Sequence, residues 1–322
     1  MMERIKFAVI SDTHFYAQTA QNDKITWNLP LSTLSREIGE AMVSALNSHC
    51  PDFVIHCGDF AGMCDVIDFD FGVGIMDMLK CPWYVVPGNH DTWYNHDAGY
   101  DGLRENFSAL YDLPDGICHY SKIIKGMLFL FVDNCYWIQK NGDYTSYLYK
   151  DIYDSGRILG QYLPPFEMEW IKEELEANHD LPAVIVCHNP PAIKSNLSPS
   201  TGKGMNNEAD PILRIAPFFN ADEMMDVLKS FCNVKAVFCG HYHINDYFEK
   251  NGIAICQTCS MREYPFEYRI VEVNNQKMEV KTFGLYDESF AERSFIPERK
   301  NEWVKGKRND REITICMERI QQ

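Results

Sequence analysis

The sequence of 322 residues predicts an α/β fold in which two mixed β-sheets pack face to face as a sandwich, with helices on the outside. Short continuous apolar runs, rich in β-branched and aromatic residues, indicate strands that are buried on both faces and therefore lie in covered sheets. Segments with apolar residues at helical spacing alternate with these runs, which favours at least partly parallel pairing.

Each predicted element is defined by such a pattern. The strand-like runs are Lys6 to Ile10, Asp52 to His56, Trp83 to Val86, Leu128 to Val132, Ala183 to Cys187 and Val234 to Cys239. The helical segments are Ser35 to Ser48, Phe166 to Asn178 and Ala221 to Phe231. In the first helix, Ile38, Met42 and Leu46 recur every four residues and so lie on one face.

The pattern changes after residue 250, where an Asn-rich turn separates two strand-like runs, Tyr268 to Val273 and Met278 to Phe283. This is the signature of a β-hairpin. We expect the hairpin to join Leu128 to Val132 and Ile253 to Cys256 in a second sheet. Three long irregular stretches follow strand ends and are expected to wall a pocket. They are Phe15 to Thr33, Asn134 to Leu163 and Ile193 to Asn220.

The amino-acid composition limits the binding partners that we expect for this chain. Acidic residues outnumber basic ones 46 to 30, and the net charge of −16 opposes binding to a nucleic acid polymer.

The longest N-terminal apolar stretch, Phe7 to Ile10, is too short for a signal peptide or a membrane span. Twelve scattered cysteines predict a reducing cytoplasm. The pair Cys256 and Cys259 lies in a strand-like run, which favours buried core cysteines over a redox motif.

Five of the apolar runs stop at residues of metal-ligand type. In chain order these candidates are Asp12, His14, Asp59, Asn89, His188, His241 and His243. Because the carboxyl ends of strands in an α/β sheet face one crevice, we expect these side chains to meet. Carboxylate, amide and imidazole ligands without a thiolate suit manganese, iron or zinc. The sequence therefore predicts a site for two divalent metal ions.

The chemistry of such a site is phosphate-ester hydrolysis. Asp59 has two carboxylate oxygens and is able to bridge two cations. Two ions about 3.5–4 Å apart hold a hydroxide between them and clamp the attacking and leaving oxygens at phosphorus. An anionic substrate whose transition state spreads charge over several oxygens needs this arrangement most.

The ordered set of motifs resembles the calcineurin-like metallophosphoesterase family, whose pattern is D-x-H, G-D, G-N-H-[DE], H and G-H-x-H. The match covers roughly residues 5 to 285. The resemblance implies a four-layer α/β/β/α catalytic domain, taken as residues 1–287, followed by a charged C-terminal extension, residues 288–322, whose basic residues are expected to be solvated.

The resemblance also implies a role for each motif residue. The first metal would be bound by Asp12, His14, Asp59 and His243, and the second by Asp59, Asn89, His188 and His241. His90 would stabilise the transition state or protonate the leaving oxygen. That role needs hydrogen-bond support for the imidazole, which Asp91 or a loop carboxylate is placed to give.

Departures from the family pattern narrow the substrate. Arginines typical of protein serine/threonine phosphatases are missing after Asp59, and Pro87 replaces the one before the G-N-H motif. Gly62 stands where purple acid phosphatases have a metal-binding tyrosine. DNA-repair nucleases of the superfamily add a capping domain and a basic groove, and this acidic sequence gives no sign of either. Once these branches of the family are set aside, the chain resembles the bacterial phosphodiesterase branch.

We therefore expect a small phosphodiester as substrate, with no membrane partner. A phosphomonoesterase or pyrophosphohydrolase with the same site stays open, especially if Arg157 or Arg214 reaches the substrate. A non-catalytic scaffold with this fold is the third reading. Aromatic residues that are candidates to stack on a base or sugar are Trp93, Tyr94, Tyr242 and those between Tyr136 and Tyr153. The sequence assigns neither a substrate-binding residue nor an oligomeric state.

Overall fold

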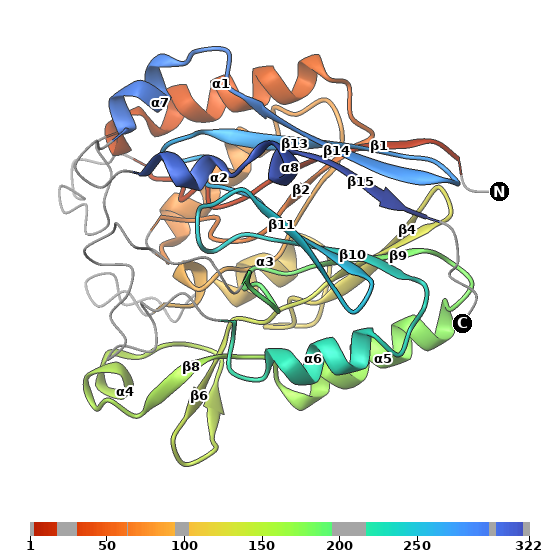
Figure 1. Cartoon of the computed structure of the whole chain (residues 1–322). Helices are drawn as coiled ribbons and strands as arrows, with labels where there is room; N and C mark the ends of the chain where they lie inside the picture. The colour runs from red at the N-terminus through yellow and green to blue at the C-terminus, as the bar shows by residue number, and fades with distance from the viewer. Residues whose placement is uncertain are drawn as a thin grey trace.

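The structure of the chain is a computed structural model that describes residues 3–17, 31–62, 64–93, 103–194, 217–295 and 301–317. Two six-stranded mixed sheets pack face to face, and helices cover the outer face of each. Figure 1 shows the resulting layers, with helices α1 and α7 above the first sheet and α5 and α6 below the second. The predicted sandwich flanked by helices is confirmed.

The first sheet combines three parallel strands with an antiparallel meander. Its order is β15 (Glu312–Cys316), β14 (Lys277–Gly284), β13 (Glu267–Val273), β1 (Ile5–Ile10), β2 (Phe53–His56) and β3 (Trp83–Val85). Strands β1, β2 and β3 are parallel, and β13 pairs antiparallel with β1. The hairpin β13–β14 was predicted in the second sheet, and that prediction is wrong. Pairing with β1 buries Val271 between the sheets, as a central position requires.

The second sheet is parallel at its centre and antiparallel at both edges. Its order is β11 (Asp246–Lys250), β12 (Ile253–Gln257), β10 (Val234–Cys239), β9 (Ala183–Val186), β5 (Met127–Phe131) and β4 (Tyr120–Ile124). Strands β12, β10, β9 and β5 run parallel, which points their carboxyl ends toward one edge of the sandwich. The strands predicted at Leu128 and Ile253 belong here, as expected.

Aromatic packing joins the two sheets. Phe7 stacks on Phe53 with ring centroids 5.2 Å apart, and Phe129 meets Phe7 edge to face at 5.5 Å. The outer face of the first sheet is covered by α1 (Ser35–Ser48), α2 (Val66–Met76) and α7 (Ser289–Ser294). The second is covered by α5 (Pro165–Ala177) and α6 (Ala221–Leu228). These contacts fix the strand ends from which the site is built.

A small three-stranded sheet occupies most of the stretch Asn134 to Leu163, which was predicted to be irregular. It consists of β6 (Tyr136–Gln139), β7 (Tyr144–Thr145) and β8 (Ile158–Tyr162), with α4 (Lys150–Asp154) beside it. Figure 1 shows it projecting at the lower left. Buried Arg104, in α3 (Arg104–Ala109), ties it to the core through an ion pair with Asp133 and a cation–π contact with Tyr136 at 4.1 Å. Residues 18–30 and 195–216 of the other two stretches lie outside the described residues.

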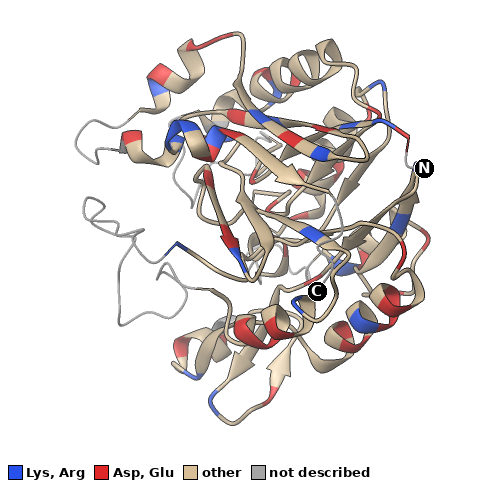
Figure 2. Cartoon of the chain, turned by 45° about the vertical axis from the view of Figure 1, so that its right-hand side comes forward, with Lys and Arg blue, Asp and Glu red and all other residues tan. Residues whose placement is uncertain are grey.

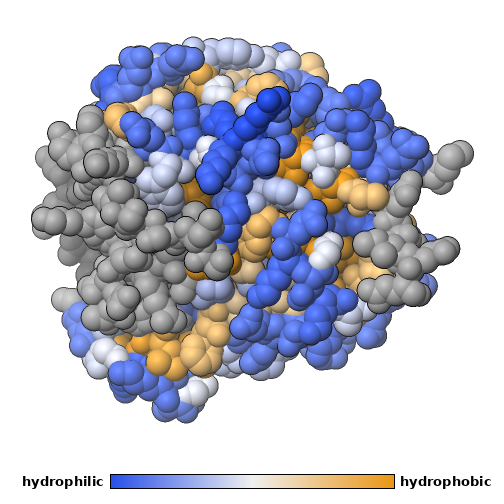
Figure 3. Space-filling view, viewed as in Figure 1, coloured by the Kyte–Doolittle hydropathy of each residue, from blue (hydrophilic) through white to orange (hydrophobic). Residues whose placement is uncertain are grey.

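The end of the chain returns to the core. Strand β15 pairs antiparallel with β14 as the edge of the first sheet, and helix α8 (Arg308–Arg311) precedes it. The division at residue 287 stays a prediction. Lys305, Lys307 and Arg308 are exposed, as predicted for the basic residues of this segment, whereas Arg311 is partly buried and pairs with buried Glu267. Much of the face seen in Figure 3 is hydrophilic. Within the described residues, no helix is both long and apolar enough to cross a membrane.

All twelve cysteines are free. Cys256 and Cys259 are fully buried, which confirms their interpretation as core residues.

Candidate metal centre

Each predicted ligand follows the carboxyl end of a strand. Asp12 and His14 come after β1, Asp59 after β2 and Asn89 after β3. The second sheet supplies His188 after β9, and His241 and His243 after β10. Both sheets therefore direct their parallel strands toward one place, and residues separated by more than two hundred positions become neighbours.

The first group of candidate ligands consists of Asp12, His14, Asp59 and His243, all buried, with one ligand atom from each within 4.8 Å of the others. His243 Nε2 lies 3.3 Å from Asp12 Oδ1 and 3.3 Å from His14 Nε2. His14 Nε2 is 3.8 Å from Asp59 Oδ2. Carboxylate oxygens and imidazole nitrogens turned toward a common centre are the donor set of a divalent cation.

The second group shares Asp59 and adds His188 and His241, again with ligand atoms within 4.8 Å of one another. Asp59 Oδ2 is 3.3 Å from His188 Nε2. The Oδ1 atom of Asn89 is 2.9 Å from His188 Nε2 and 2.8 Å from His241 Nδ1. All seven predicted ligands thus lie in two adjoining groups with Asp59 in both, and their chemistry fits manganese, iron or zinc.

Neighbouring groups orient two of these histidines. His188 Nδ1 donates a hydrogen bond of 2.8 Å to the Cys57 carbonyl oxygen, which leaves Nε2 facing the second group. His243 Nδ1 lies 2.6 Å from Glu263 Oε1, which turns its Nε2 toward Asp12. Such partners fix the ring orientation and tautomer of a metal-binding histidine. The sequence analysis did not identify Glu263 as a partner of the site, because Glu263 lies in a loop beyond β12 with no recognisable motif.

The two carboxylates of the cluster are ionised although both are buried. Burial alone would raise the pKa of Asp12, but the facing His243 lowers it to about 2. Burial also opposes ionisation of Asp59, and His188 holds its pKa well below the usual range.

The histidines respond in opposite ways. Burial disfavours a charged imidazole, yet Asp59 raises the pKa of His188 to about 9, and Asp12 raises that of His243 to about 10. Burial and the neighbouring His188 lower the pKa of His241 to about 3. Without metal, the two ionised carboxylates therefore face two protonated imidazoles, and a divalent cation that binds there would displace those protons.

His90 lies beside the first group and is half-buried. Its ring is 4.8 Å from that of His14, centroid to centroid, and perpendicular to it. Burial lowers the pKa of His90, and the Asp59 carboxylate acts in the opposite direction. The backbone N–H of His90 donates to Asp59 Oδ1 at 2.8 Å. The shared carboxylate therefore also positions the backbone of this residue.

Asp91 does not support His90 in the way predicted. Its two carboxylate oxygens accept hydrogen bonds from the backbone N–H groups of Phe60, Ala61 and Gly88, at 3.0, 2.8 and 2.7 Å. Asp91 thereby joins the loop after β2 to the loop after β3. A pattern of residue types does not show where a carboxylate points, so this structural use was not visible in the sequence.

The ligand loops use unusual backbone conformations. Five of the seven predicted ligands have positive φ angles: Asp12 (53°), His14 (40°), Asp59 (52°), His241 (77°) and His243 (55°). Non-glycine residues in this region cost about 1–3 kcal/mol each and persist where the surroundings fix them. Gly88 permits a further close approach, since a Cβ atom there would lie 2.0 Å from the Asp59 nitrogen.

We predict that Gly88→Ala lowers the free energy of unfolding by roughly 1–3 kcal/mol, because the added methyl group displaces Asp59. Mn²⁺ binding should weaken with it. Gly74→Ala is the matched control: its Cβ would meet no atom within 4 Å, on an exposed position of α2. This change should stabilise the chain by about 0.5–1 kcal/mol. Urea denaturation of the metal-free variants checks both values, and equal stability of the two would contradict the close approach.

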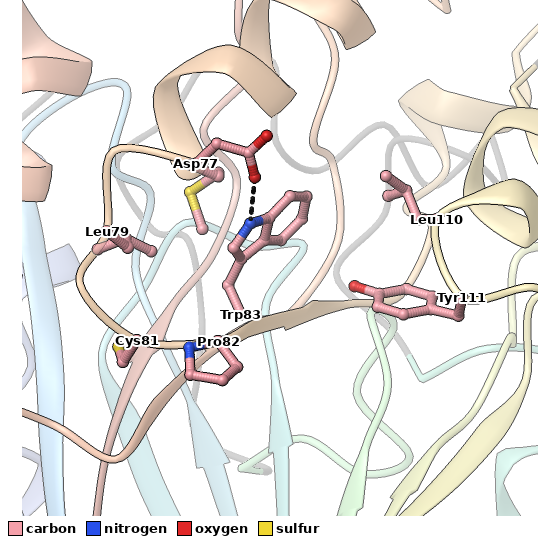
Figure 4. A pocket seen from close by; sticks show the side chains of 8 residues that line it. Asp77, Leu79, Cys81, Pro82, Trp83, Leu110 and Tyr111 are labelled. Atoms are coloured by element: carbon pink, nitrogen blue, oxygen red, sulfur yellow. Dashed lines mark hydrogen bonds between the residues drawn. The ribbon is translucent and has the colours of Figure 1, made fainter.

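A pocket of about 340 Å³ lies away from this cluster (Figure 4). Trp83 in its wall starts β3, whereas Asn89 follows the opposite end of that strand. The indole N–H of Trp83 donates to Asp77 Oδ1 at 3.0 Å, and Leu79, Leu110 and Tyr111 add mostly apolar lining. None of these residues belongs to the ligand groups. The pocket is separate from the candidate metal centre.

A sandwich of two mixed sheets with a buried carboxylate and imidazole cluster at its strand ends defines a class of metal-binding hydrolase folds. The chain belongs to the calcineurin-like phosphoesterase family, whose profile matches residues 5–245. The resemblance inferred from the motifs is confirmed.

Among similar proteins is a probable cyclic nucleotide phosphodiesterase of Fibrobacter succinogenes, 22% identical over 246 residues, or 74% of this chain and 73% of the relative. The glycerophosphodiester phosphodiesterase GpdQ of Enterobacter lignolyticus is 23% identical over 73% of this chain and 70% of its own. In fold, the chain is similar to a dimetal phosphatase of Danio rerio, with a TM-score of 0.63, 13% identity and coverage of 98% and 99% of the two chains.

Proposed function

We propose that this chain is a phosphoesterase that uses two divalent metal ions to hydrolyse a small phosphodiester. The observation that carries the proposal is the presence of Asp59 in both ligand groups. Asp12, His14, Asp59 and His243 would hold one ion, and Asp59, Asn89, His188 and His241 the other. Manganese, iron and zinc all suit these ligands, and cells choose among such metals largely by availability.

The residues around the ions would divide the remaining work. When bound, the two ions would lower the pKa of a water between them and offset the charge of the phosphoryl group. His90 stands next to this place, and we assign to it a hydrogen bond or proton for the leaving oxygen. Asp59 accepts the backbone N–H of His90 and would thereby set the distance of His90 from the substrate.

A diester is favoured because the site contains few groups suited to a second phosphate charge. Among the described residues, the largest charged influences on Asp12 come from His243, His188 and Asp59, those on Asp59 come from histidines alone, and no lysine or arginine is among them. Arg157 is exposed and bonds to Ser155, and Arg214 lies outside the described residues. Both curated relatives carry phosphodiesterase names, which supports the same choice.

The substrate would be small. The net charge is −16, and Figure 2 shows acidic residues along α5 and α6, which together oppose binding of a polyanion. Partly exposed Trp93 lies 5.6 Å from His90 by ring centroids and is a candidate to contact a base or sugar, whereas Tyr242 is buried in an apolar cluster. Tyr94 lies outside the described residues. Free cysteines throughout agree with a cytoplasmic location.

Two alternatives keep the same fold. A phosphomonoesterase or pyrophosphohydrolase would use the same ligands, and the name of the Danio rerio structure, a dimetal phosphatase, supports testing it. A non-catalytic scaffold would be expected to have lost ligands, whereas all seven, together with His90, are present and clustered.

The test compares bis-p-nitrophenyl phosphate with p-nitrophenyl phosphate after removal of metals and addition of Mn²⁺. We expect no turnover without metal and a higher kcat/KM for the diester with it. A cyclic nucleotide and a glycerophosphodiester then serve to separate the two substrate types. Preference for the monoester would favour the first alternative, and a metal-loaded protein inert toward every ester would favour the scaffold.

A further inference from the structure

The loop that carries His241 and His243 needs support from outside itself. Both histidines have left-handed backbone conformations, with φ of 77° and 55°. Such conformations are stable only where neighbouring structure fixes them. Asp12 accepts the backbone N–H of His241 at 3.1 Å, and Glu263 holds the His243 ring. These two contacts hold the histidines themselves, and the residues that alternate with and follow them make further contacts.

The C-terminal segment packs against the same loop. The backbone N–H of Asn245 donates to the Val304 carbonyl oxygen at 2.8 Å. The Val304 side chain is buried in a small apolar cluster with Tyr242 and Ile244, the residues that alternate with the two histidines. Trp303 packs against the same cluster. Gly306 approaches so closely that a Cβ there would lie 2.2 Å from the Asn245 carbonyl oxygen.

Charged groups attach the same segment on either side of the apolar cluster. Lys194 Nζ lies 2.5 Å from Asp246 Oδ1 and 2.9 Å from Asp310 Oδ1, which joins the end of the ligand loop to α8. Arg269 Nη1 donates to the Asp310 carbonyl oxygen at 2.9 Å. The carboxylates of Asp246 and Asp310 are buried, while the Lys194 side chain that joins them is partly exposed.

A shared carboxylate adds a further link. Glu267 Oε2 accepts from Asn245 Nδ2 at 2.7 Å and from Arg311 Nη1 at 2.6 Å. The segment from residue 303 to 311, which we call the C-terminal clamp, therefore contacts the loop by a backbone bond, apolar packing and ionic links. The family profile ends at residue 245, so this element lies beyond the part of the chain that defines the family.

We propose that the C-terminal clamp is a positioning element that holds His241 and His243 in the geometry needed to bind metal. The inference rests on the proposed metal-binding function and assigns to the end of the chain a part in it. Partners that orient metal-binding histidines typically change metal affinity by about 10–100-fold when they are lost. The clamp packs on Tyr242, the residue between two such histidines, and bonds to the backbone of Asn245 just after them, so its loss should affect both ion sites.

Two variants test the clamp. Val304→Ala removes packing on Tyr242 and Ile244, and Lys194→Met removes the link between Asp246 and Asp310. Ile313→Val is the control, since it removes a buried methyl group from the same tail at a position in β15 away from the loop. The affinity for Mn²⁺ is measured by competition with a chelator, and hydrogen exchange is followed in peptides that cover residues 240–246.

We expect about tenfold weaker Mn²⁺ binding in both clamp variants and faster exchange in residues 240–246 of the metal-free protein. Activity should return at saturating Mn²⁺, and Ile313→Val should change neither measurement. Unchanged affinity and exchange in the clamp variants, or equal losses in the control, would overturn the proposal. If the wild-type chain bound no Mn²⁺, the proposed function would fail, while the exchange measurement would still decide whether the clamp fixes the loop.

Discussion

Asp59→Asn is expected to lower kcat for phosphodiester hydrolysis by about 10³-fold or more, at least the loss that follows removal of a single transition-state-stabilising group. Asp59 is the one described side chain that belongs to both ligand groups. Asp59 Oδ2 faces both groups while Oδ1 accepts the His90 N–H. An amide oxygen carries no negative charge to hold two cations, and the amide NH₂ is unable to accept from His90. Steady-state kinetics with bis-p-nitrophenyl phosphate and Mn²⁺ measure the effect.

Asp65→Asn is the matched control for this change. Asp65 caps helix α2 by accepting the N–H of Ile67 at 2.8 Å, and asparagine is an equally good cap. The control should therefore keep its activity and stability. Circular dichroism should show Asp59→Asn to be folded. Retention of wild-type kcat by folded Asp59→Asn would remove the basis for a shared ligand.

His90→Ala is expected to reduce kcat by about 10²–10⁴-fold for esters with alkyl leaving groups, the usual contribution of a general acid. The loss should be much smaller for p-nitrophenyl esters, because p-nitrophenolate leaves without protonation. Mn²⁺ affinity should change little, since His90 belongs to neither ligand group among the described residues. A series of diesters with leaving groups of increasing pKa measures the dependence.

The control is His179→Ala, an exposed histidine just beyond the end of α5. It should behave as wild type throughout. An equal loss on every leaving group would show that His90 stabilises charge or positions substrate and does not protonate the leaving oxygen. A loss of bound metal in His90→Ala would instead make His90 a ligand.

The elements predicted most accurately are those with strong local patterns. Helix Ser35–Ser48 and strand Val234–Cys239 were predicted with the observed bounds, since one has a regular apolar stripe and the other is apolar at every position except Lys235. The candidate ligands were predictable for a topological reason, because parallel strands bring their carboxyl ends together. Residue type at the strand ends was therefore enough to predict that Asp12 and His241 lie close to one another, as they do.

What the sequence did not predict depends on contacts between distant segments. The pattern of β13 shows that it is a strand but not that its partner is β1, more than 250 residues earlier in the chain. The strands β6, β7 and β8 are short and held by buried Arg104, whose partners no local pattern shows. Glu263 and Val304 act through spatial proximity to the ligand loop and have no motif of their own.

The most direct measurement of the central claim is the number and coupling of Mn²⁺ ions bound to the metal-free chain after reconstitution. Because Asp59 is placed to touch both ions, we predict two equivalents per chain and an electron paramagnetic resonance spectrum of an exchange-coupled pair. In Asp59→Asn the coupling should be lost. A folded wild-type chain that binds a single ion, or two ions without coupling, would contradict a centre built around a shared carboxylate.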